Sequence, residues 1–362
     1  MRQFLAILFL LLLPSLAHAA DYASALLMDA ASGQILQEEN ADLSRSPASV
    51  VKLMLLLLAR EAQDQGRVSP ETLLESSSLA QSMGGSQVYL AKGDKTSFQR
   101  LIEAVALGSA NDAAVTVAEG LFGSIEETLA AMNNRAAGLG MESSQYANVT
   151  GLPASNGMRN LTSARDQAIL AREVILHYPG VLEWTSKTWT RFRRGLVLAN
   201  TNTVLKKFKG MDGLKTGYHD EARSNLVASA ERNGRRLIAV VLGAESQDIR
   251  DNKVVELLES GFQDWTLRLA LRKNDGLGVE FPVRKSWKGR VRVAAAADLQ
   301  YLVRKEDLAR GSISLDRAED LSAPIREGEV LGEIQVLLEG EVLASVPALA
   351  QNSVRKTWIS RK

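Results

Sequence analysis

The sequence predicts an α+β fold in which strands enclose a helical block, followed by a smaller β-rich unit. Three observations predict it. Apolar strand-like segments lie near both ends of residues 22–271, the stretch between them has helical apolar spacing, and the residues after 274 contain only short alternating runs. The chain has 362 residues, of which 46% are hydrophobic and 23% charged, so two folded units are expected.

The composition excludes several functional classes. The formal net charge is +1, which lacks the basic excess of a nucleic-acid-binding domain. The chain has no cysteine and only three histidines, so disulfides and thiol nucleophiles are excluded and multi-histidine metal sites nearly so. A nucleophile in this protein must therefore be an oxygen or an amine.

Residues 1–19 have the features of a cleavable secretory signal. Arg2 supplies a positive charge, residues 4–13 form an apolar run, and Ala17-His18-Ala19 places small residues around a cleavable bond. The alternative is an uncleaved membrane anchor, which needs about 20 apolar residues. Pro14 ends the run well before that length, so we expect an exported protein.

A β-hairpin and a long buried helix are expected next. The hairpin strands, residues 22–29 and 34–37, flank a turn-forming Ala31-Ser32-Gly33 segment. Ser46 is expected to be the N-cap of a helix over residues 48–65, with Pro47 at its first position. The first part of this helix is apolar on nearly every face except at Lys52, which is typical of a helix inside a domain.

The remaining elements follow from apolar spacing and from Gly- or Pro-containing breaks. Helices are expected at 99–108, 112–121, 125–139, 162–178 and 249–271, an ordered loop at 148–159, and strands at 213–217, 224–230 and 237–243. Asn274-Asp275-Gly276 is the expected joint, and later strands are expected at 290–293, 328–335 and 341–346. The expected domains are therefore residues 20–273 and residues 274–362.

Ser49 and Lys52 are the first candidate catalytic pair. They are three residues apart on the expected helix and therefore share a face, so the amine can reach the hydroxyl. The spacing alone is weak evidence, because Ser353 and Lys356 have it too. Lys52 differs from Lys356 because it lies on a helix that is expected to be buried. Burial disfavours a protonated lysine, which makes Lys52 a natural general base.

Two further motifs occur later in the chain. Ser109-Ala110-Asn111 lies at a break between two expected helices and offers a hydroxyl and an amide, although an ordinary helix N-cap is the alternative. Lys215-Thr216-Gly217 lies on an expected strand, where a cation and a hydroxyl can bind a carboxylate and the glycine permits close backbone approach. A surface strand end is the alternative there. The three motifs in this order match an arrangement of serine acyltransferases.

These three motifs resemble those of penicillin-recognising enzymes, and more narrowly those of D-alanyl-D-alanine carboxypeptidases of the penicillin-binding protein 5 type. The segments Asn148 with Gly151-Leu152, and Asn225-Leu226-Val227, extend the resemblance. It implies a β-lactamase/transpeptidase-like domain, with an antiparallel sheet and a helical block, before the small β-rich domain. It also implies a periplasmic or cell-envelope enzyme that removes the terminal D-alanine from peptidoglycan pentapeptides, without metal or organic cofactor, and that β-lactam antibiotics inhibit.

The resemblance also implies a role for each motif residue. Ser49 would form the acyl-ester, Lys52 would activate it, and Ser109 would relay a proton to the leaving D-alanine. The expected substrate-binding residues are Asn111, which would hold the peptide backbone, Lys215, Thr216 and Gly217 at the terminal carboxylate, and Tyr218. The backbone N–H groups of Ser49 and Tyr218 would form the oxyanion hole.

Four other functions are compatible with parts of this sequence. A Ser-His-Asp hydrolase would have to use His177, at an expected helix end, or His219, a candidate substrate contact near Lys215. A class A β-lactamase uses a glutamate for deacylation, and none occurs between Ser143 and Arg172, so slow deacylation is expected. An endopeptidase of the same fold remains open. A non-catalytic envelope scaffold is disfavoured because no motif residue is lost.

Two basic clusters near the end of the chain are candidate membrane contacts. The tail combines apolar and basic residues, namely Val354, Trp358 and Ile359 with Arg355, Lys356, Arg361 and Lys362. It is expected to touch the anionic inner-membrane surface weakly or to be a frayed terminus. The second cluster surrounds Trp287 and is either a solvated strand face or an envelope contact. Its basic members are Arg284, Lys285, Lys288, Arg290 and Arg292.

Overall fold

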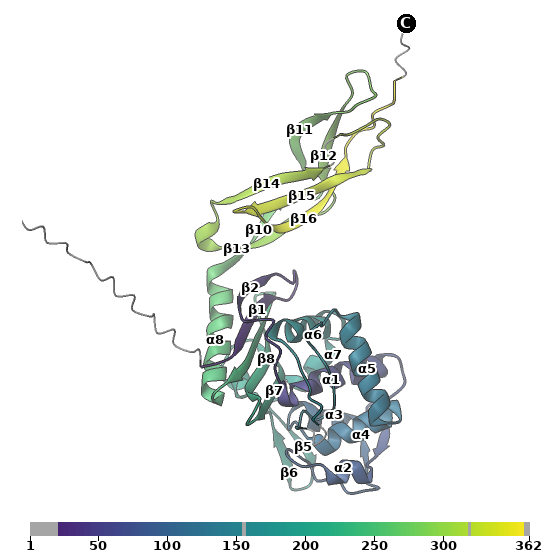
Figure 1. Cartoon of the computed structure of the whole chain (residues 1–362), viewed down its shortest axis with the longest axis vertical. Coiled ribbons are helices and arrows are strands. Elements are labelled where there is room, and N and C mark those ends of the chain that lie inside the picture. Colours follow the sequence, from purple (N-terminus) through teal and green to yellow (C-terminus); the bar gives the residue numbers. More distant parts are fainter. Residues whose placement is uncertain (1–20, 154–156, 318–319, 358–362) are drawn as a thin grey trace, which may run out of the picture.

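The computed structural model describes residues 21–153, 157–317 and 320–357, which form two units in succession (Figure 1). The N-terminal unit contains a five-stranded antiparallel sheet of order β2-β1-β9-β8-β7. Its strands are β1 (Ser24–Asp29), β2 (Ile35–Glu39), β7 (Met211–His219), β8 (Arg223–Arg232) and β9 (Arg235–Ala244). The expected α+β class, with strands from both ends of the unit in one sheet, is confirmed.

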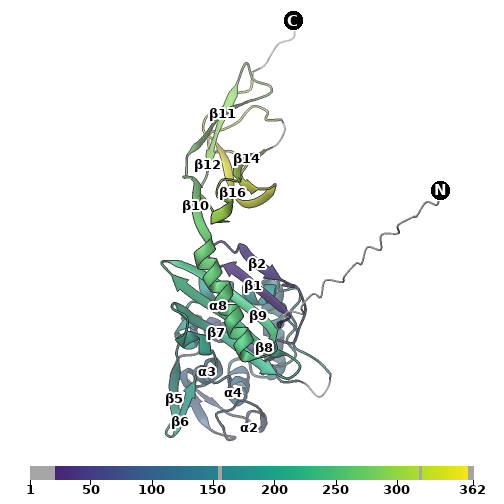
Figure 2. The ribbon, with the colours of Figure 1, turned by 90° about the vertical axis from the view of Figure 1, so that its left-hand side faces the viewer.

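Both faces of this sheet are buried, so its central strands are almost continuously apolar. Along β1, Leu26 and Met28 pack into the core shared with the helical block. Ala25 and Leu27 point the other way, into a second core beneath α8 (Gln247–Asp264). Figure 2 shows α8 running across that face of the sheet.

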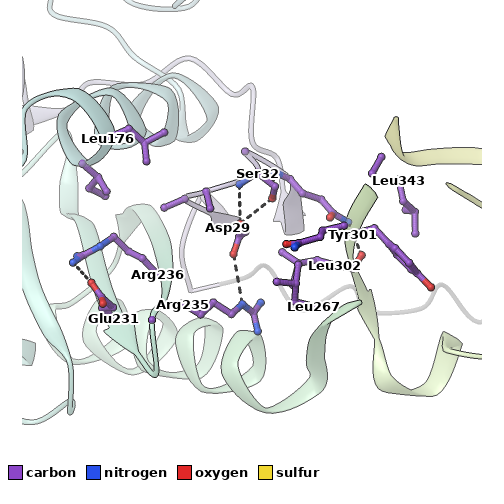
Figure 3. A pocket seen from close by; sticks show the side chains of 18 of the residues that line it. Asp29, Ser32, Leu176, Glu231, Arg235, Arg236, Leu267, Tyr301, Leu302 and Leu343 are labelled. Carbon is purple, nitrogen blue, oxygen red and sulfur yellow. Dashed lines mark hydrogen bonds and ion pairs between the residues drawn. The ribbon is translucent and has the colours of Figure 1, made fainter. Parts of the chain in front are cut away.

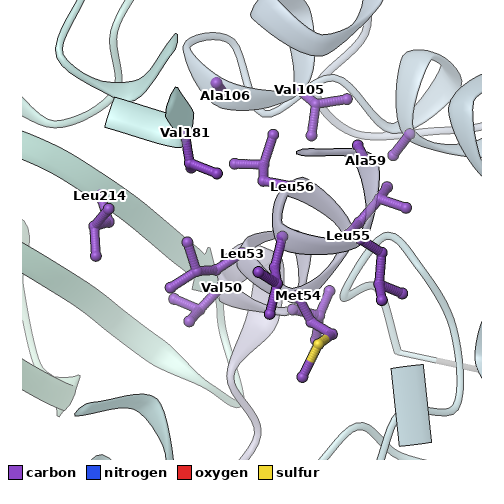
Figure 4. Close-up of a cluster of buried hydrophobic side chains, with 14 of the residues drawn as sticks. Val50, Leu53, Met54, Leu55, Leu56, Ala59, Val105, Ala106, Val181 and Leu214 are labelled. Atoms are coloured by element: carbon purple, nitrogen blue, oxygen red, sulfur yellow. The ribbon is translucent and has the colours of Figure 1, made fainter. Parts of the chain in front are cut away.

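The helical block is built around α1 (Lys52–Asp64), which follows a 3-10 turn, η1 (Ala48–Val51). Apolar side chains cover nearly the whole circumference of α1, and Figure 4 shows Leu56 close to Val105 and Val181 of neighbouring helices. The neighbours are α2 (Ser78–Ser82), α3 (Phe98–Ala106), α4 (Asn111–Phe122), α5 (Ile125–Gly138), α6 (Ala164–His177) and α7 (Gly180–Thr185). The expected buried helix is therefore present, in the middle of its unit.

Short elements outside the main sheet were not predicted. They are β3 (Leu73–Glu75), β4 (Lys95–Ser97), η2 (Thr203–Lys206) and a hairpin of β5 (Trp189–Arg193) and β6 (Leu196–Ala199).

Two expectations about helix ends were wrong. Ser46 is not an N-cap: the chain enters η1 with Pro47 at the cap position and no side-chain cap, and Ser46 Oγ instead lies 3.1 Å from His219 Nε2. The last helix ends at Asp264 rather than at residue 271, because residues 265–271 pair as a strand, β10 (Trp265–Leu271), with β13 (Leu299–Arg304).

The C-terminal unit is mostly β, as expected. Its main sheet has the order β11-β12-β16-β15-β14, formed by β11 (Gly276–Pro282), β12 (Arg290–Ala295), β16 (Glu341–Ala350), β15 (Val330–Leu338) and β14 (Gly311–Arg317). A 3-10 turn, η3 (Lys305–Asp307), follows β13. Strand β10 is bonded to this unit ahead of the joint expected at Asn274, so we place the joint at the end of α8.

A cavity of about 1090 Å³ lies where the two units meet. Leu302 of β13 packs into the core beneath α8, and its carbonyl accepts a hydrogen bond of 3.1 Å from Gln34 Nε2. Figure 3 shows Asp29 paired with Arg235 and facing Leu267 across the cavity. Arg235 also donates to the carbonyl of Trp265 at 3.2 Å, so the end of α8 is held to the sheet.

Within the described residues, no helix combines the length and the apolar character needed to cross a membrane. The expected signal, residues 1–19, lies outside the described residues.

Candidate active site

The first two motifs meet around the side chain of Lys52. Its Nζ lies 2.8 Å from Ser49 Oγ, 2.7 Å from Asn111 Oδ1 and 2.6 Å from the carbonyl oxygen of Thr150. The first helical turn, the start of α4 and the loop after α5 each supply one of these groups. Ser49 itself is only half-buried, so its hydroxyl is accessible.

Two glycines hold the backbone around Ser49 by direct contact. Ala48 has the left-handed conformation, with φ +48°, so the chain bends sharply just before Ser49. A Cβ on Gly151 would lie 2.1 Å from the carbonyl oxygen of Ala48, and one on Gly217 would lie 2.5 Å from that of Pro47. Neither position has room for a side chain, and Gly217 therefore brings strand β7 against the turn that carries Ser49.

Asn225 fixes the same turn from the next strand. Its buried side chain donates to the carbonyl of Pro47 at 3.2 Å and accepts from the backbone N–H of Gly243 at 2.7 Å. A buried amide with both ends bonded favours one geometry, because any shift would leave a polar group unsatisfied.

The environment of Lys52 favours the neutral amine. Burial lowers its pKa well below the usual value, and the positive charge of Lys215 lowers it further. A neutral amine has two N–H groups and one lone pair. The oxygens of Asn111 and Thr150 can accept the two N–H groups, which leaves the lone pair for the hydroxyl proton of Ser49.

The Thr150 carbonyl was not predicted as part of the site. Asn148 positions it: Asn148 Oδ1 accepts hydrogen bonds from the backbone N–H of Thr150 at 3.1 Å and of Gly151 at 2.7 Å. The same loop thus holds the acceptor for Lys52 and the glycine that packs on Ala48. The only sequence signal was the Asn- and Gly-rich composition of this expected loop.

Ser109 of the second motif is hydrogen-bonded to Lys215 of the third motif. Ser109 is buried and has φ +58°, and its Oγ accepts a hydrogen bond of 3.0 Å from Lys215 Nζ. Neither Ser109 nor Asn111 is the N-cap of α4; Ala110 is at that position, without a side-chain cap. Asn111 instead donates from Nδ2 to the carbonyl of Gly84 at 2.7 Å, so its second amide hydrogen is the one available to a ligand.

Lys215 is also buried, and its pKa is lowered to about 7 by burial and by the positive charge of Arg250. Arg250, in the first turn of α8, is itself buried and paired with Asp251 at 2.6 Å. Two cations thus lie near one another on the β7 side of the site. Arg250 was not predicted, because the sequence around it is an ordinary amphipathic helix.

Thr216 and Tyr218 follow Lys215 along β7, but Thr216 is buried and Tyr218 is exposed to solvent. Thr216 is buried, and its Oγ1 lies 2.6 Å from Thr201 Oγ1, in the segment after β6. Tyr218 is 63% exposed, and its hydroxyl donates to Asp220 at 3.0 Å.

The two histidines of the described residues lie outside this network. His177 ends α6 and pairs with Glu173 at 2.7 Å. His219 Nδ1 accepts from the backbone N–H of Ala222 at 3.1 Å, so its Nε2–H can donate to Ser46. Burial lowers the pKa of His219. Neither histidine is bonded to Ser49, whose Oγ contacts Lys52 and Thr150. This disfavours a Ser-His-Asp mechanism.

Among the described residues, no group of three His, Asp or Glu side chains is arranged to hold a metal ion.

Two family profiles and several known proteins match this sequence. A family profile described as D-alanyl-D-alanine carboxypeptidase, peptidase family S11, matches residues 14–246. A second profile, described as the C-terminal domain of penicillin-binding protein 5, matches residues 266–356. The chain is 33% identical to the D-alanyl-D-alanine carboxypeptidase DacF of Bacillus subtilis, over 94% of this chain and 87% of that protein. It is 31% identical to DacD of Escherichia coli, over 93% and 87%.

Two solved structures superpose on nearly the whole chain, and a third superposes on about two thirds of it. DacD of Francisella tularensis superposes with a TM-score of 0.81 at 27% identity, covering 93% of this chain and 94% of that one. Penicillin-binding protein 5 of Haemophilus influenzae gives a TM-score of 0.79 at 27% identity, covering 93% and 98%. Penicillin-binding protein D2 of Listeria monocytogenes, in an ampicillin-bound form, gives 0.62 at 32% identity, covering 68% and 98%.

Proposed function

Because the chain belongs to the D-alanyl-D-alanine carboxypeptidase family of serine peptidases, we propose that Ser49 is the residue through which it cleaves its substrate. The protein is a serine-type D-alanyl-D-alanine carboxypeptidase that acts on peptidoglycan. The reaction removes the terminal D-alanine of a pentapeptide stem in two steps, through an acyl-enzyme. The observation that carries the assignment of Ser49 is the short distance, 2.8 Å, between its Oγ and the buried amine of Lys52.

Acylation begins with proton transfer from Ser49 Oγ to the neutral Lys52. The oxygen then attacks the carbonyl carbon of the D-alanyl-D-alanine bond, and the negative charge develops on the carbonyl oxygen. The backbone N–H groups of Ser49 and Tyr218 are the proposed donors to this oxyanion. The contact between Gly217 and the Ser49 turn supports this assignment, because it brings strand β7 beside the Ser49 backbone.

Ser109 is the proposed proton relay to the departing D-alanine. Its hydroxyl gives a proton to the leaving amine and regains one from Lys215, to which it is hydrogen-bonded. A lysine with a pKa of about 7 can supply that proton near neutral pH. Water then attacks the ester carbonyl and gives a proton through Ser109 to the now neutral Lys215. Lys52 returns its proton to Ser49, so both lysines and the serine are restored.

The carboxylate of the substrate is proposed to bind on the β7 side. Lys215 supplies a buried cation, Thr216 a hydroxyl, and Arg250 adds positive charge behind them. Asn111 is proposed to hold the peptide backbone through its remaining amide hydrogen. The direct test is D-alanine release from a soluble pentapeptide by wild type and by Ser49→Ala. Release by the variant at the wild-type rate would overturn the assignment.

We also propose that β-lactams acylate Ser49 and leave it slowly. The relatives include a penicillin-binding protein in an ampicillin-bound form. The segment between Ser143 and Arg172 contains no glutamate to activate a deacylating water. The ester formed by a β-lactam should therefore persist, and the antibiotic should act as an inhibitor.

We propose that the enzyme is exported and that it contacts the membrane surface peripherally. The signal features of residues 1–19 support export. The test is the mass of the protein isolated from the cell envelope, which should lack these residues. For the membrane, Val354 of the tail is buried and bridges to Ile325, so it does not serve as a lipid contact. The candidate residues 358–362 lie outside the described residues.

The turn around Trp287 supports membrane contact better than Val354 does. Trp287 is 71% exposed, and its sequence neighbours Lys285 and Lys288 have no carboxylate partner among the described residues. An exposed tryptophan among cations is typical of a membrane-interface contact. Trp287→Ala should reduce co-sedimentation with vesicles containing anionic lipid, and unchanged sedimentation would remove this turn from the proposal.

A further inference from the structure

Two aromatic side chains project into solvent from segments that border the active site. Tyr89, in the loop before β4, is 70% exposed, and Trp189, the first residue of β5, is 60% exposed. Neither contributes to the hydrophobic cores. Large exposed aromatic groups next to a binding site commonly mark a contact surface.

The loop that carries Tyr89 is built to display it. The carboxylate of Asp112 accepts hydrogen bonds from the backbone N–H groups on either side, those of Val88 at 3.1 Å and Leu90 at 3.0 Å. Val88 and Leu90 are buried, whereas Tyr89 between them has φ +58° and points outward. That backbone conformation costs about 1–2 kcal/mol in a residue other than glycine. The two hydrogen bonds to Asp112 hold the backbone of Tyr89 in this conformation.

The hairpin β5–β6 presents Trp189 on its outer face. Trp189 and Arg191 are exposed, and Val197 lies opposite Arg191 on the same face. Phe192 and Leu198 point inward and are buried in the main core. In Figures 1 and 2 this hairpin lies at the end of the N-terminal unit that is farthest from the C-terminal unit.

Both segments are bonded to active-site residues and to each other. Asn111 donates from its backbone N–H to the carbonyl of Ser86 at 2.7 Å, which ties the Tyr89 loop to the second motif. Thr201, just after the hairpin, lies 2.6 Å from Thr216 of the third motif. Arg193 of the hairpin donates to the carbonyl of Tyr89 at 3.2 Å. The loop and the hairpin therefore form one continuous rim beside the site.

We propose that this rim, with Tyr89, Trp189 and Arg191 at its surface, binds the glycan strand that carries the stem peptide being cleaved. The inference rests on the proposed function, because it requires the stem peptide to enter the Ser49–Lys215 site. The C–H faces of pyranose rings stack on exposed aromatic rings, which bury apolar area at little cost in conformational entropy. Arg191 and Arg194 have no ion-pair partner among the described residues and complement the free carboxylates of neighbouring stem peptides.

The test compares a soluble pentapeptide with insoluble, pentapeptide-rich peptidoglycan. The variants are Trp189→Ala and Tyr89→Gly, the glycine being chosen because it removes the ring and suits the positive φ. Ile313→Ala is the matched control, since Ile313 is a large apolar side chain that is 48% exposed but lies on β14 of the other unit, outside every proposed binding surface. D-alanine release is measured on both substrates. Co-sedimentation with the insoluble polymer is measured in a Ser49→Ala background, which separates binding from turnover.

Each rim variant should bind and process the polymer about tenfold less well, the size of a contact worth about 1.4 kcal/mol. Release from the soluble pentapeptide should stay within about twofold of wild type. Peptide-free glycan strands should compete for the polymer binding that Trp189 provides. Equal losses on both substrates, an equal loss in Ile313→Ala, or no competition by peptide-free glycan would overturn the proposal. Absence of release from either substrate by wild type would instead contradict the proposed function, and the binding assay would still test the rim.

Discussion

The side-chain oxygen of Asn111 lies 2.7 Å from the Nζ of the buried Lys52, and it is a neutral acceptor. A neutral partner satisfies one N–H of the amine and stabilises its protonated form much less than a negative charge would. A carboxylate at the same position would favour the ammonium ion instead. The amide at residue 111 therefore keeps the proposed base available.

Asn111→Asp should for this reason abolish most activity at neutral pH. The new negative charge would raise the pKa of Lys52, and loss of general-base catalysis costs about 10²–10⁴-fold in rate. The measurement is the rate of acylation by benzylpenicillin as a function of pH. The ratio of the variant rate to the wild-type rate should increase as the pH rises and Lys52 of the variant loses its proton, because loss of the Lys215 proton lowers both rates alike. A loss of equal size at every pH would show that the carboxylate does not act through the base.

The pH dependence of the wild-type enzyme should be bell-shaped. Activity requires Lys52 without its proton, so kcat/KM should rise with pH through the lowered pKa of Lys52. It also requires Lys215 with its proton, so kcat/KM should fall above the Lys215 pKa of about 7. The profile is measured on a soluble pentapeptide, and a rate that keeps rising to pH 10 would contradict the role of Lys215.

Arg250→Gln should move the alkaline limb of that profile to higher pH. The positive charge of Arg250 lowers the pKa of Lys215, so its removal lets Lys215 keep its proton longer. The same variant should raise KM more than it lowers kcat, because the charge is proposed to act on the substrate carboxylate. An alkaline limb that stays in place would show that Arg250 does not influence Lys215.

Gly151→Ala should destabilise the protein more than Gly140→Ala. Both glycines have positive φ, +85° and +72°, so each alanine carries a backbone cost of about 1–2 kcal/mol. Only the Cβ at residue 151 would meet another atom, 2.1 Å away at the carbonyl of Ala48, whereas that at residue 140 meets nothing within 4 Å. Overpacking should add about 1–3 kcal/mol. The measurement is the midpoint of thermal unfolding of each variant. Equal shifts in the two variants would mean that the loop carrying residue 151 moves away from Ala48 without an energetic cost.

The main features of the fold could be predicted because they depend on local patterns. The apolar run with a single lysine indicated a buried helix, and α1 is that helix. The continuation of an amphipathic stretch predicts a helix over residues 265–271, yet most of these residues also alternate between apolar and polar. Pairing with β13 decides in favour of the strand, and that partner is far away in sequence.

The parts of the site that sequence reasoning missed are those without a residue signature. The acceptor at Thr150 is a main-chain carbonyl, which any residue could supply. Arg250 acts through its charge from a different element, and nothing in its own segment marks it. The β5–β6 hairpin has a weak signal in the sequence, the strand-favouring residues Trp189, Thr190 and Phe192 before Arg194-Gly195, but residues 189–193 lack the strict apolar–polar alternation that predicts a strand.

The central claim is that Ser49 carries the acyl group, and intact-protein mass spectrometry after exposure to benzylpenicillin tests it most directly. Wild type should gain the mass of one penicilloyl group, peptide mapping should place it on Ser49, and Ser49→Ala should gain none. The same wild-type preparation should release D-alanine from a soluble pentapeptide. An adduct on the Ser49→Ala variant, or on another residue of wild type, would contradict the account.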